Sequence, residues 1–375
     1  MKITNVTLTP IHSRRETGLI SPHVIVELET DEGLVGLGEM SDFGHQPPYL
    51  APHLDGLCAA LKELLFGRDP FDFARIIGAL AQRHSGVVGS LIVCGIDLAL
   101  HDLQGKALGR PVSDLLGGQV RDRLRVCYPI FPMRQPEDVE QNLKRVADRL
   151  AEGQDVFRLY IGVDLDLDEA FLDGFRQRFG KQVVLKSIDA SGRFRDWRIA
   201  VQAIRRLRQY DFMLVESPCW RGDLAGMAEV RRQVDIPISE HVGSLTDALQ
   251  LAQARAVDIF NISLCSLGGI YQARKVYALA EATGLACLIG TTQELSIGTA
   301  GQAHLGAAMP NLHFPADPTG PLLFLDDVVR SRVRYEHGYL IVPGGPGLGM
   351  ELDHEKLREF RHELHTAPLR ADWRA

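Results

Sequence analysis

The chain has 375 residues, of which 45% are hydrophobic and 24% charged, and its formal net charge is -7 at pH 7. This composition is typical of a soluble globular protein, and the length allows a barrel of about 200 to 250 residues plus a second domain. The negative charge excludes a basic surface for nucleic acid or for an anionic membrane, because both need clustered Lys and Arg. We therefore expect no nucleic-acid partner and no membrane partner.

The cysteines and the first residues indicate a cytoplasmic protein. Six cysteines are scattered without a Cys-x-x-Cys pair, which favours reduced thiols over a disulfide framework. No window approaches 18 uninterrupted apolar residues, and the opening MKITNVTLTP has the character of a strand rather than of a signal peptide.

Residues 1–122 are predicted to form an α+β capping domain. Apolar and polar residues alternate over 2–12, 22–30 and 34–40, which predicts an antiparallel sheet. Helical patterns follow at about 51–65, 71–83 and 90–107. The connection at 38–52 is rich in Gly and Pro and carries His45, so it is either a functional lid or a surface loop with a solvated histidine.

Residues 123–325 are predicted to form a (β/α)8-type barrel, a modified TIM barrel. A first strand fits 125–131, and a helix fits 136–152. Short apolar runs, each separated from the next by a helical pattern of about 10 to 15 residues, then predict βαβ units in a parallel sheet; the runs are 155–162, 183–191, 211–218, 236–242, 257–263 and 285–294. Residues 326–375, with a hairpin at 332–343 and a helix at 351–365, are predicted to return to the cap.

Polar residues close these apolar runs, at the end of a barrel where chemistry takes place. Asp189, Glu216 and either Glu240 or His241 end consecutive strands, which predicts a site for a divalent metal ion. Neighbouring residues of a strand point to opposite faces, so only one of the last two faces the axis, and we favour His241. Mg²⁺ prefers oxygen ligands, and the histidine leaves Mn²⁺ open.

Arg158 and Tyr160 are two apart on one strand, so both side chains point to the same side. A cation at about 4 Å contributes roughly 4 kcal/mol, and about 1.4 kcal/mol equals one pKa unit, so Arg158 is expected to bring a tyrosinate within range of neutral pH. The alternative is a structural pair that fills the end of the barrel. Lys186 is three residues before Asp189, so in a regular strand the two side chains point to opposite faces, and Lys186 is expected to point toward the helices.

The cap, the barrel and the strand-end acids together resemble the enolase superfamily over essentially the whole chain. The motifs that carry the resemblance are DAS at Asp189, VESP at Glu216 and LGGI at 267–270, which look like the mandelate racemase and muconate lactonizing branches. The resemblance implies abstraction of a proton next to a carboxylate, with the enediolate stabilised on Mg²⁺. The chain departs from the common pattern, because Arg158-x-Tyr160 replaces a Lys-x-Lys pair and Ser263 stands where a lysine is usual.

A narrower resemblance is to the galactarate dehydratase subfamily, through VCYPIF, DVFRLY, PISEHV, DIFNIS, GTTQELS, DPTGP and MSDFGH. It implies Asp189, Glu216 and His241 as metal ligands, and it implies acid and base roles for Arg158, Tyr160 and His45. On this basis we expect a hydro-lyase that dehydrates a sugar acid such as galactarate. The sequence QRHSGVVGSLIV at 82–93 replaces a tyrosine-rich loop of that subfamily, which predicts a more open pocket in which galactarate is a poor substrate.

Four further residues are expected to bind the substrate, a small carboxylate. Asn261 and Glu294 lie at strand ends, and Thr291 and Thr292 offer hydroxyl or backbone contacts. The alternatives to dehydration are a racemase, epimerase or cycloisomerase of a hydroxy or related acid, and a catalytically idle barrel kept as a binding or oligomeric protein. We also expect a homo-oligomer.

Overall fold

The structure is a computed structural model that describes residues 1–41 and 54–361. The loop histidine His45 therefore lies outside the described residues.

The cap begins with an antiparallel sheet in the order β1-β2-β3, formed by β1 (Ile3–Arg14), β2 (Ile20–Thr30) and β3 (Val35–Met40). Three helices and one short helical turn follow: α1 (Leu54–Leu65), α2 (Phe73–Arg83), α3 (Gly86–Leu108) and α4 (Val112–Leu115). Helix α3 crosses β3 so closely that a Cβ on Gly38 would lie 1.9 Å from the carbonyl oxygen of Gly95. The alternating strands predicted for this region are confirmed.

Helix α3 is long and apolar enough to cross a membrane by length and composition alone. It is instead the central helix of the cap, because 78% of its apolar window is buried inside the protein. Its apolar residues face β3 and the short helix α10 (Leu264–Leu267) of the barrel, so they fill the junction between the two domains.

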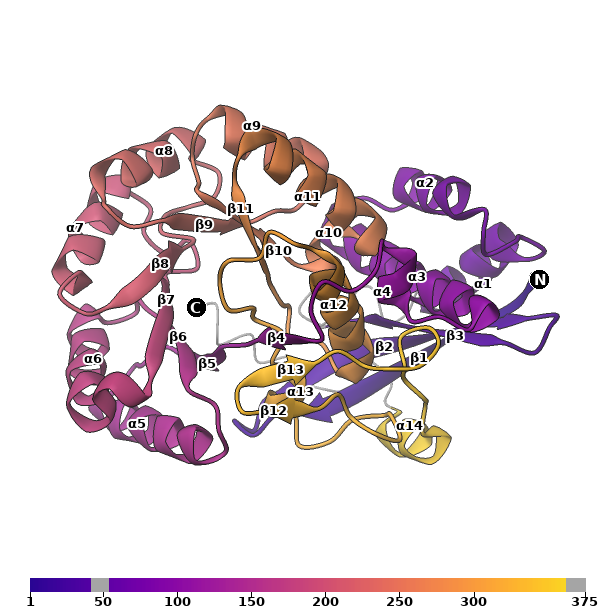
Figure 1. Ribbon diagram of the computed structural model, residues 1–375, viewed down its shortest axis with the longest axis horizontal. Coiled ribbons are helices and arrows are strands. Elements are labelled where there is room, and N and C mark those ends of the chain that lie inside the picture. The colour runs from indigo at the N-terminus through magenta and orange to yellow at the C-terminus, as the bar shows by residue number, and fades with distance from the viewer. Residues whose placement is uncertain (42–53, 362–375) are drawn as a thin grey trace.

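The second domain is a curled sheet of seven parallel strands with helices on its outside, as Figure 1 shows. Each strand pairs with the next along the chain; they are β5 (Tyr128–Ile130), β6 (Val156–Tyr160), β7 (Val184–Asp189), β8 (Phe212–Glu216), β9 (Ile238–His241), β10 (Ile259–Ile262) and β11 (Ala286–Ile289). The predicted barrel class and its last six strands are confirmed.

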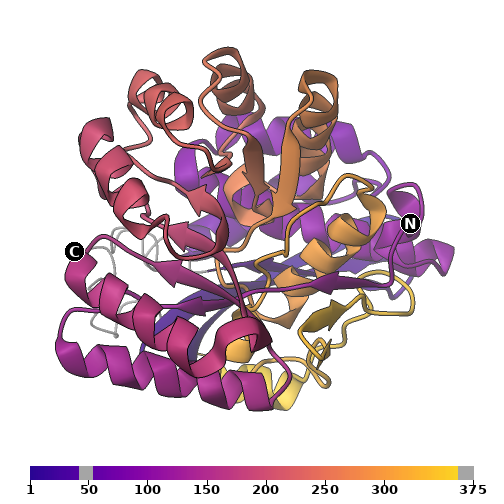
Figure 2. The same ribbon diagram turned by 60° about the vertical axis from the view of Figure 1, so that its left-hand side comes forward.

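The helices of this domain surround the outer face of the curled sheet (Figure 2). They are α5 (Pro136–Ala151), α6 (Leu165–Phe179), α7 (Trp197–Leu207), α8 (Leu224–Gln233), α9 (Leu245–Gln253) and α11 (Ile270–Thr283), with a 3-10 turn η3 at Gly180–Gln182. Aspartates fix several helix starts: the side chain of Asp164 accepts the free N–H groups of α6, and Asp196 and Asp223 do the same for α7 and α8. Helix α12 (Ser296–Ala308) is almost entirely buried, which its small residues allow.

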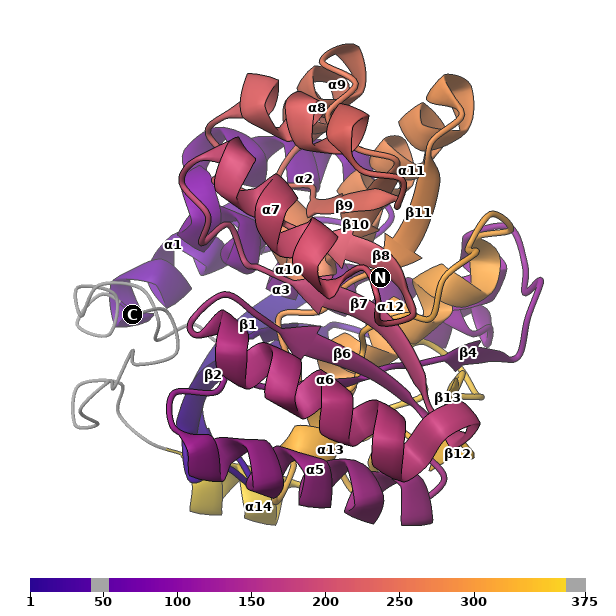
Figure 3. The ribbon, with the colours of Figure 1, turned by 90° about the vertical axis from the view of Figure 1, so that its left-hand side faces the viewer.

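The first barrel strand differs from the prediction. Residues 125–131 do not form one strand, because Arg125 belongs to β4 (Arg123–Arg125), which pairs with a hairpin from the end of the chain. That hairpin, β12 (Tyr335–Glu336) and β13 (Tyr339–Ile341), turns at His337 and Gly338, as predicted, and both turn residues have positive φ. Figure 3 shows this small sheet beside the parallel one.

Residues 312–317, which we call the closing segment, fill the gap between the first and last parallel strands. Leu312 bridges to Cys287 on one side, and Ala316 bridges to Val126 on the other. The N–H of Asp317 also donates to the carbonyl of Ile289 at 2.8 Å. The closing segment therefore takes the place of an eighth strand.

The last described residues return to the cap, as expected. After α13 (Gly320–Leu323), Phe324 bridges to Arg15, and beyond α14 (His354–Phe360) Arg361 bridges to Ile11 of β1. A buried carboxylate strengthens the junction of the two domains: Glu39 of β3 accepts hydrogen bonds from the N–H groups of Leu295 and Gly298 near the start of α12. Charge-assisted bonds of this kind each contribute about 1.5–3 kcal/mol.

Candidate active site

The strand ends bring the expected residues to one level of the sheet. The register pairs Tyr160 with Asp189, and Asp189 with Glu216. His241 ends the next strand, and its Nε2 lies 3.0 Å from Oε1 of Glu216. These side chains therefore form one cluster at the carboxyl edge of the parallel sheet, where barrel enzymes place their chemistry.

Arg158 and Tyr160 contact each other, as their spacing predicts. Nη2 of Arg158 donates to the Tyr160 hydroxyl at 2.8 Å, and the tyrosine ring stacks on Phe131, with ring centroids 5.9 Å apart. The expected tyrosinate is wrong, because burial of the phenol outweighs the charge of Arg158 and raises the pKa of Tyr160 above its usual value. The direction of this shift favours the protonated phenol of Tyr160 over a tyrosinate.

The expected direction of Lys186 is also wrong. The pairing of β6 with β7 shifts register between Phe157 and Arg158, so that Lys186 has no partner in the ladder. Such a bulge breaks the alternation of faces. Lys186 consequently points into the barrel, fully buried, with its Nζ 2.5 Å from Oδ1 of Asp317.

Asp189 and Glu216 are two buried carboxylates on neighbouring strands. Burial, followed by the charge of Glu216, raises the pKa of Asp189 to about 7. For Glu216, burial acts upward, but Arg158 and His241 hold its pKa well below the usual range. Repulsion between the two groups is what a bound cation relieves, and Oε2 of Glu216 is buried without a hydrogen bond from the described residues.

The donor set therefore fits a divalent cation in its chemistry: two carboxylates and an imidazole at adjacent strand ends. Among residues 1–41 and 54–361, no three Asp, Glu, His or Cys side chains already surround a common point. His241 Nε2 lies 3.0 Å from Oε1 of Glu216 in this arrangement. Glu240 points elsewhere, accepting from the Ser217 hydroxyl and from the His241 N–H, which agrees with the choice of His241.

The four residues expected to bind substrate are largely occupied by protein contacts. Nδ2 of Asn261 donates to Glu216 at 3.1 Å, so this side chain lies beside the candidate metal ligands. Glu294 accepts from the hydroxyls of Thr291 and Thr292 at 2.5 and 2.7 Å. In the structure the Thr291 and Thr292 hydroxyls support the loop after β11. The role of all four residues in substrate binding stays a prediction.

Asp317 is a site residue that the sequence analysis missed. It lies at the end of the closing segment, 3.5 Å from Nη1 of Arg158, and it also accepts the Cys127 thiol. The available signal was the alternation of Leu312, Phe314 and Ala316 before the acid, which is typical of a strand. The prolines at 315 and 318 masked it.

The loop after β6 is held by Asp168, a buried residue of α6 whose Oδ2 accepts from the Gly162 N–H at 2.8 Å. Burial raises the pKa of Asp168 to about 7. An unfolded Asp titrates near about pH 3.9. Between the two values only the folded chain retains the proton, so the free energy of unfolding falls as pH rises through this window.

We expect Asp168→Asn to remove this pH dependence while keeping an acceptor for Gly162. Relative to the parent chain, the variant gains at least about 1.4 kcal/mol of unfolding free energy between pH 4 and pH 8, which corresponds to one pKa unit. Urea unfolding at both pH values measures the gain, with exposed Asp173→Asn on the same helix as the control. Parallel pH profiles for Asp168→Asn and the parent would contradict the assignment.

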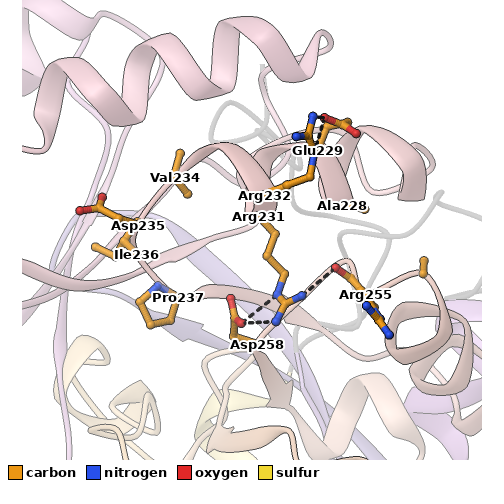
Figure 4. A pocket seen from close by; sticks show the side chains of 11 residues that line it. Ala228, Glu229, Arg231, Arg232, Val234, Asp235, Ile236, Pro237, Arg255 and Asp258 are labelled. Carbon is orange, nitrogen blue, oxygen red and sulfur yellow. Dashed lines mark hydrogen bonds and ion pairs between the residues drawn. The ribbon is translucent and has the colours of Figure 1, made fainter.

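A surface cavity lies away from this cluster. It measures about 720 Å³ and lies beside the loop that leads from α8 into β9, at the opposite end of the strand from His241. Figure 4 shows that two of its three arginines are paired: Arg231 bonds Asp258, and Arg232 bonds Glu229. These two ion pairs involve four of the six charged residues that line the cavity.

A cap of antiparallel strands on a parallel barrel, with acids at consecutive strand ends, is the architecture of a barrel enzyme whose site lies at the strand ends. Comparison with protein families gives the family itself. Residues 142–356 match the enolase C-terminal domain-like family, and residues 1–117 match the N-terminal domain of the mandelate racemase / muconate lactonizing enzymes. The chain belongs to this branch of the enolase superfamily, whose members typically use a divalent ion such as Mg²⁺ or Mn²⁺.

The relatives correct the narrower expectation. A chloromuconate cycloisomerase of Pseudomonas putida is 28% identical over 94% of both chains, and an N-succinyl-L-Arg/Lys racemase of Bacillus cereus is 27% identical over 90% of both. A crystal structure of muconate cycloisomerase from Pseudomonas fluorescens superposes with a TM-score of 0.87 at 28% identity, covering 96% of this chain and 99% of the other. The expected galactarate-type dehydration is therefore wrong, and the alternative reading of a cycloisomerase or racemase fits better.

Proposed function

We propose that this protein is a cycloisomerase of an unsaturated carboxylic acid. In such a reaction a carboxylate oxygen of the substrate adds to the substrate's own double bond, and the carbon next to a second carboxylate takes up a proton. The names of the cycloisomerase relatives support this class of substrate. The observation that carries the proposal is the Tyr160 hydroxyl at the end of β6, which accepts a hydrogen bond from Nη2 of Arg158 at 2.8 Å.

One proton donor suffices for this reaction, and Tyr160 is the described residue that we assign to this role. Lys186 is bound to Asp317, and Ser263, where the common pattern has a lysine, is a buried hydroxyl. Racemisation instead needs a group on each face of the reacting carbon. Of the residues expected to act as acid or base, the remaining one, His45, lies outside the described residues.

Asp189, Glu216 and His241 are the residues that would hold the divalent ion. When bound, the ion stabilises negative charge on the carboxylate whose neighbouring carbon gains or loses the proton. Asn261 orients Glu216 through its amide, and Glu240 holds the backbone of His241.

Tyr160 transfers its proton to the substrate carbon as the new carbon–oxygen bond forms from the carboxylate lone pair. The π electrons of the double bond move toward the second carboxylate, and they then form the new carbon–hydrogen bond. Tyr160 is left as a tyrosinate beside the Arg158 guanidinium, whose charge stabilises it, and it regains a proton from solvent. Phe131 covers one face of the ring and limits the direction of transfer.

The test uses the Mn²⁺-loaded protein in D₂O with two panels: muconate and its chlorinated derivatives, and N-succinyl amino acids. We expect loss of the diene and a lactone carrying one deuterium at a single stereochemical position, read by proton NMR. Exchange of the α-hydrogen of an N-succinyl amino acid with loss of optical activity would instead make the protein a racemase. Absence of both reactions across the panels would overturn the proposal.

A further inference from the structure

The Arg158 side chain is only 3% exposed, and a buried cation of this kind is costly unless carboxylates face it. Two do: Nη1 lies 3.5 Å from Oε1 of Glu216 and 3.5 Å from Oδ2 of Asp317. The Glu216 oxygen is shared, because His241 Nε2 and Asn261 Nδ2 approach the same atom at 3.0 and 3.1 Å. The charge of Glu216 is therefore shared among Arg158, His241 and Asn261 rather than directed at Arg158 alone.

Asp317 is better placed to fix the arginine. Its backbone N–H is bonded to Ile289, which ties it to the last parallel strand. Its Oδ1 accepts from Lys186 Nζ and from the Cys127 thiol, at 2.5 and 2.8 Å. Its Oδ2 accepts no hydrogen bond from the described residues, and it faces the Arg158 guanidinium.

We propose that Asp317 is a positioning residue for proton transfer: it holds one end of the Arg158 guanidinium, so that the other end bonds the Tyr160 hydroxyl. The inference rests on the proposed role of Tyr160 as proton donor. Nη1 of Arg158 faces Asp317, and Nη2 donates to Tyr160. Because the guanidinium is planar and rigid, the position of the Asp317 carboxylate determines where Nη2 lies relative to the Tyr160 hydroxyl. If Arg158 is displaced, the Tyr160 oxygen loses the hydrogen bond from Nη2, both before the proton transfer and in the tyrosinate that the transfer forms.

A purely structural role for Asp317 makes a different prediction. If Asp317 only neutralises Lys186 in the core, then Lys186→Met and Asp317→Asn break the same ion pair and have the same effect on the site. If Asp317 positions Arg158, the two variants differ, because Lys186→Met leaves the carboxylate facing Arg158.

The readout is the NMR signal of the tyrosine Cζ carbon in protein labelled with ¹³C at that atom, since this signal responds to hydrogen bonding at the hydroxyl. The chain has eight tyrosines, and the Tyr160 signal is the one lost in Tyr160→Phe. We expect Asp317→Asn to shift the Tyr160 signal and Lys186→Met to leave it in place. Given turnover, Asp317→Asn should also lower kcat by about 100-fold with little change in KM, as expected for a misplaced catalytic group.

Equal shifts in the two variants, or an unmoved Tyr160 signal in Asp317→Asn, would overturn the inference. If Asp317→Asn does not fold because Lys186 is left unpaired, the double variant Asp317→Asn/Lys186→Met removes both charges and is expected to show the same shift. The NMR signal needs no substrate. Failure of the proposed function, seen as full turnover by Tyr160→Phe, is therefore distinguishable from failure of the positioning role.

Discussion

Tyr160→Phe is expected to lose proton transfer by about 10² to 10⁴-fold, the usual contribution of a general acid or base. The change removes one oxygen and keeps the ring stacked on Phe131. Arg158 keeps its contacts with Glu216 and Asp317, so the site should remain folded and should still bind metal. Deuterium incorporation into substrate measures the loss, and calorimetric titration with Mn²⁺ shows that the metal site persists.

Tyr128→Phe is the matched control. Tyr128 is a buried tyrosine on the adjacent strand β5, and its hydroxyl donates to Glu16 rather than to a residue of the cluster. The control should lose some stability and keep its rate of proton transfer. A Tyr160→Phe protein that incorporates deuterium as fast as this control would show that another group carries the proton.

Glu216→Gln should weaken divalent-metal binding by more than about 100-fold, since loss of a group that merely supports a ligand already costs about 10–100-fold. Glu216 lies between Asp189 on one strand and His241 on the next, so its charge is central to the donor set. Neutralising it should also lower the pKa of Asp189, because Glu216 is the second cause of that raised value. Mn²⁺ titration calorimetry and elemental analysis measure the binding.

Glu240→Gln separates the two possible ligand sets. Glu240 is equally buried and lies one residue before His241, but its carboxylate bonds Ser217 and the backbone. We expect this variant to lose no more than about 10–100-fold in Mn²⁺ affinity, as for a supporting residue, and so less than Glu216→Gln. Loss of metal in Glu240→Gln together with retention in His241→Asn would replace His241 by Glu240 as the third ligand.

The barrel could be predicted because its signal is periodic: six short apolar runs at regular spacing identify parallel strands whatever their exact residues. The polar residues that end these runs follow from the same signal, and the register indeed places Tyr160, Asp189 and Glu216 side by side. Arg158 and Tyr160 face each other because an interval of two within a regular strand fixes a common face.

The misses come from places where that regularity fails. A bulge at Lys186 reverses its face, and no residue type marks the bulge in advance. Asp317 was missed because the closing segment forms bridges rather than a full ladder, and its prolines suppress the strand signal. Sugar-acid dehydration was a wrong prediction, because the strand-end residues indicate only proton transfer beside a carboxylate. Which other bond of the substrate forms or breaks depends on the substrate, and the sequence does not identify it.

The closing segment also bears on the order in which the parts of the chain can fold during synthesis. Until residue 317 has emerged, β5 and β11 each expose an unpaired edge, and β4 waits still longer for β13. Exposed edges of this kind template pairing with other chains. We therefore expect a nascent chain that ends between β11 and Asp317 to expose both edges of its parallel sheet and to associate with other chains more readily than the finished protein does.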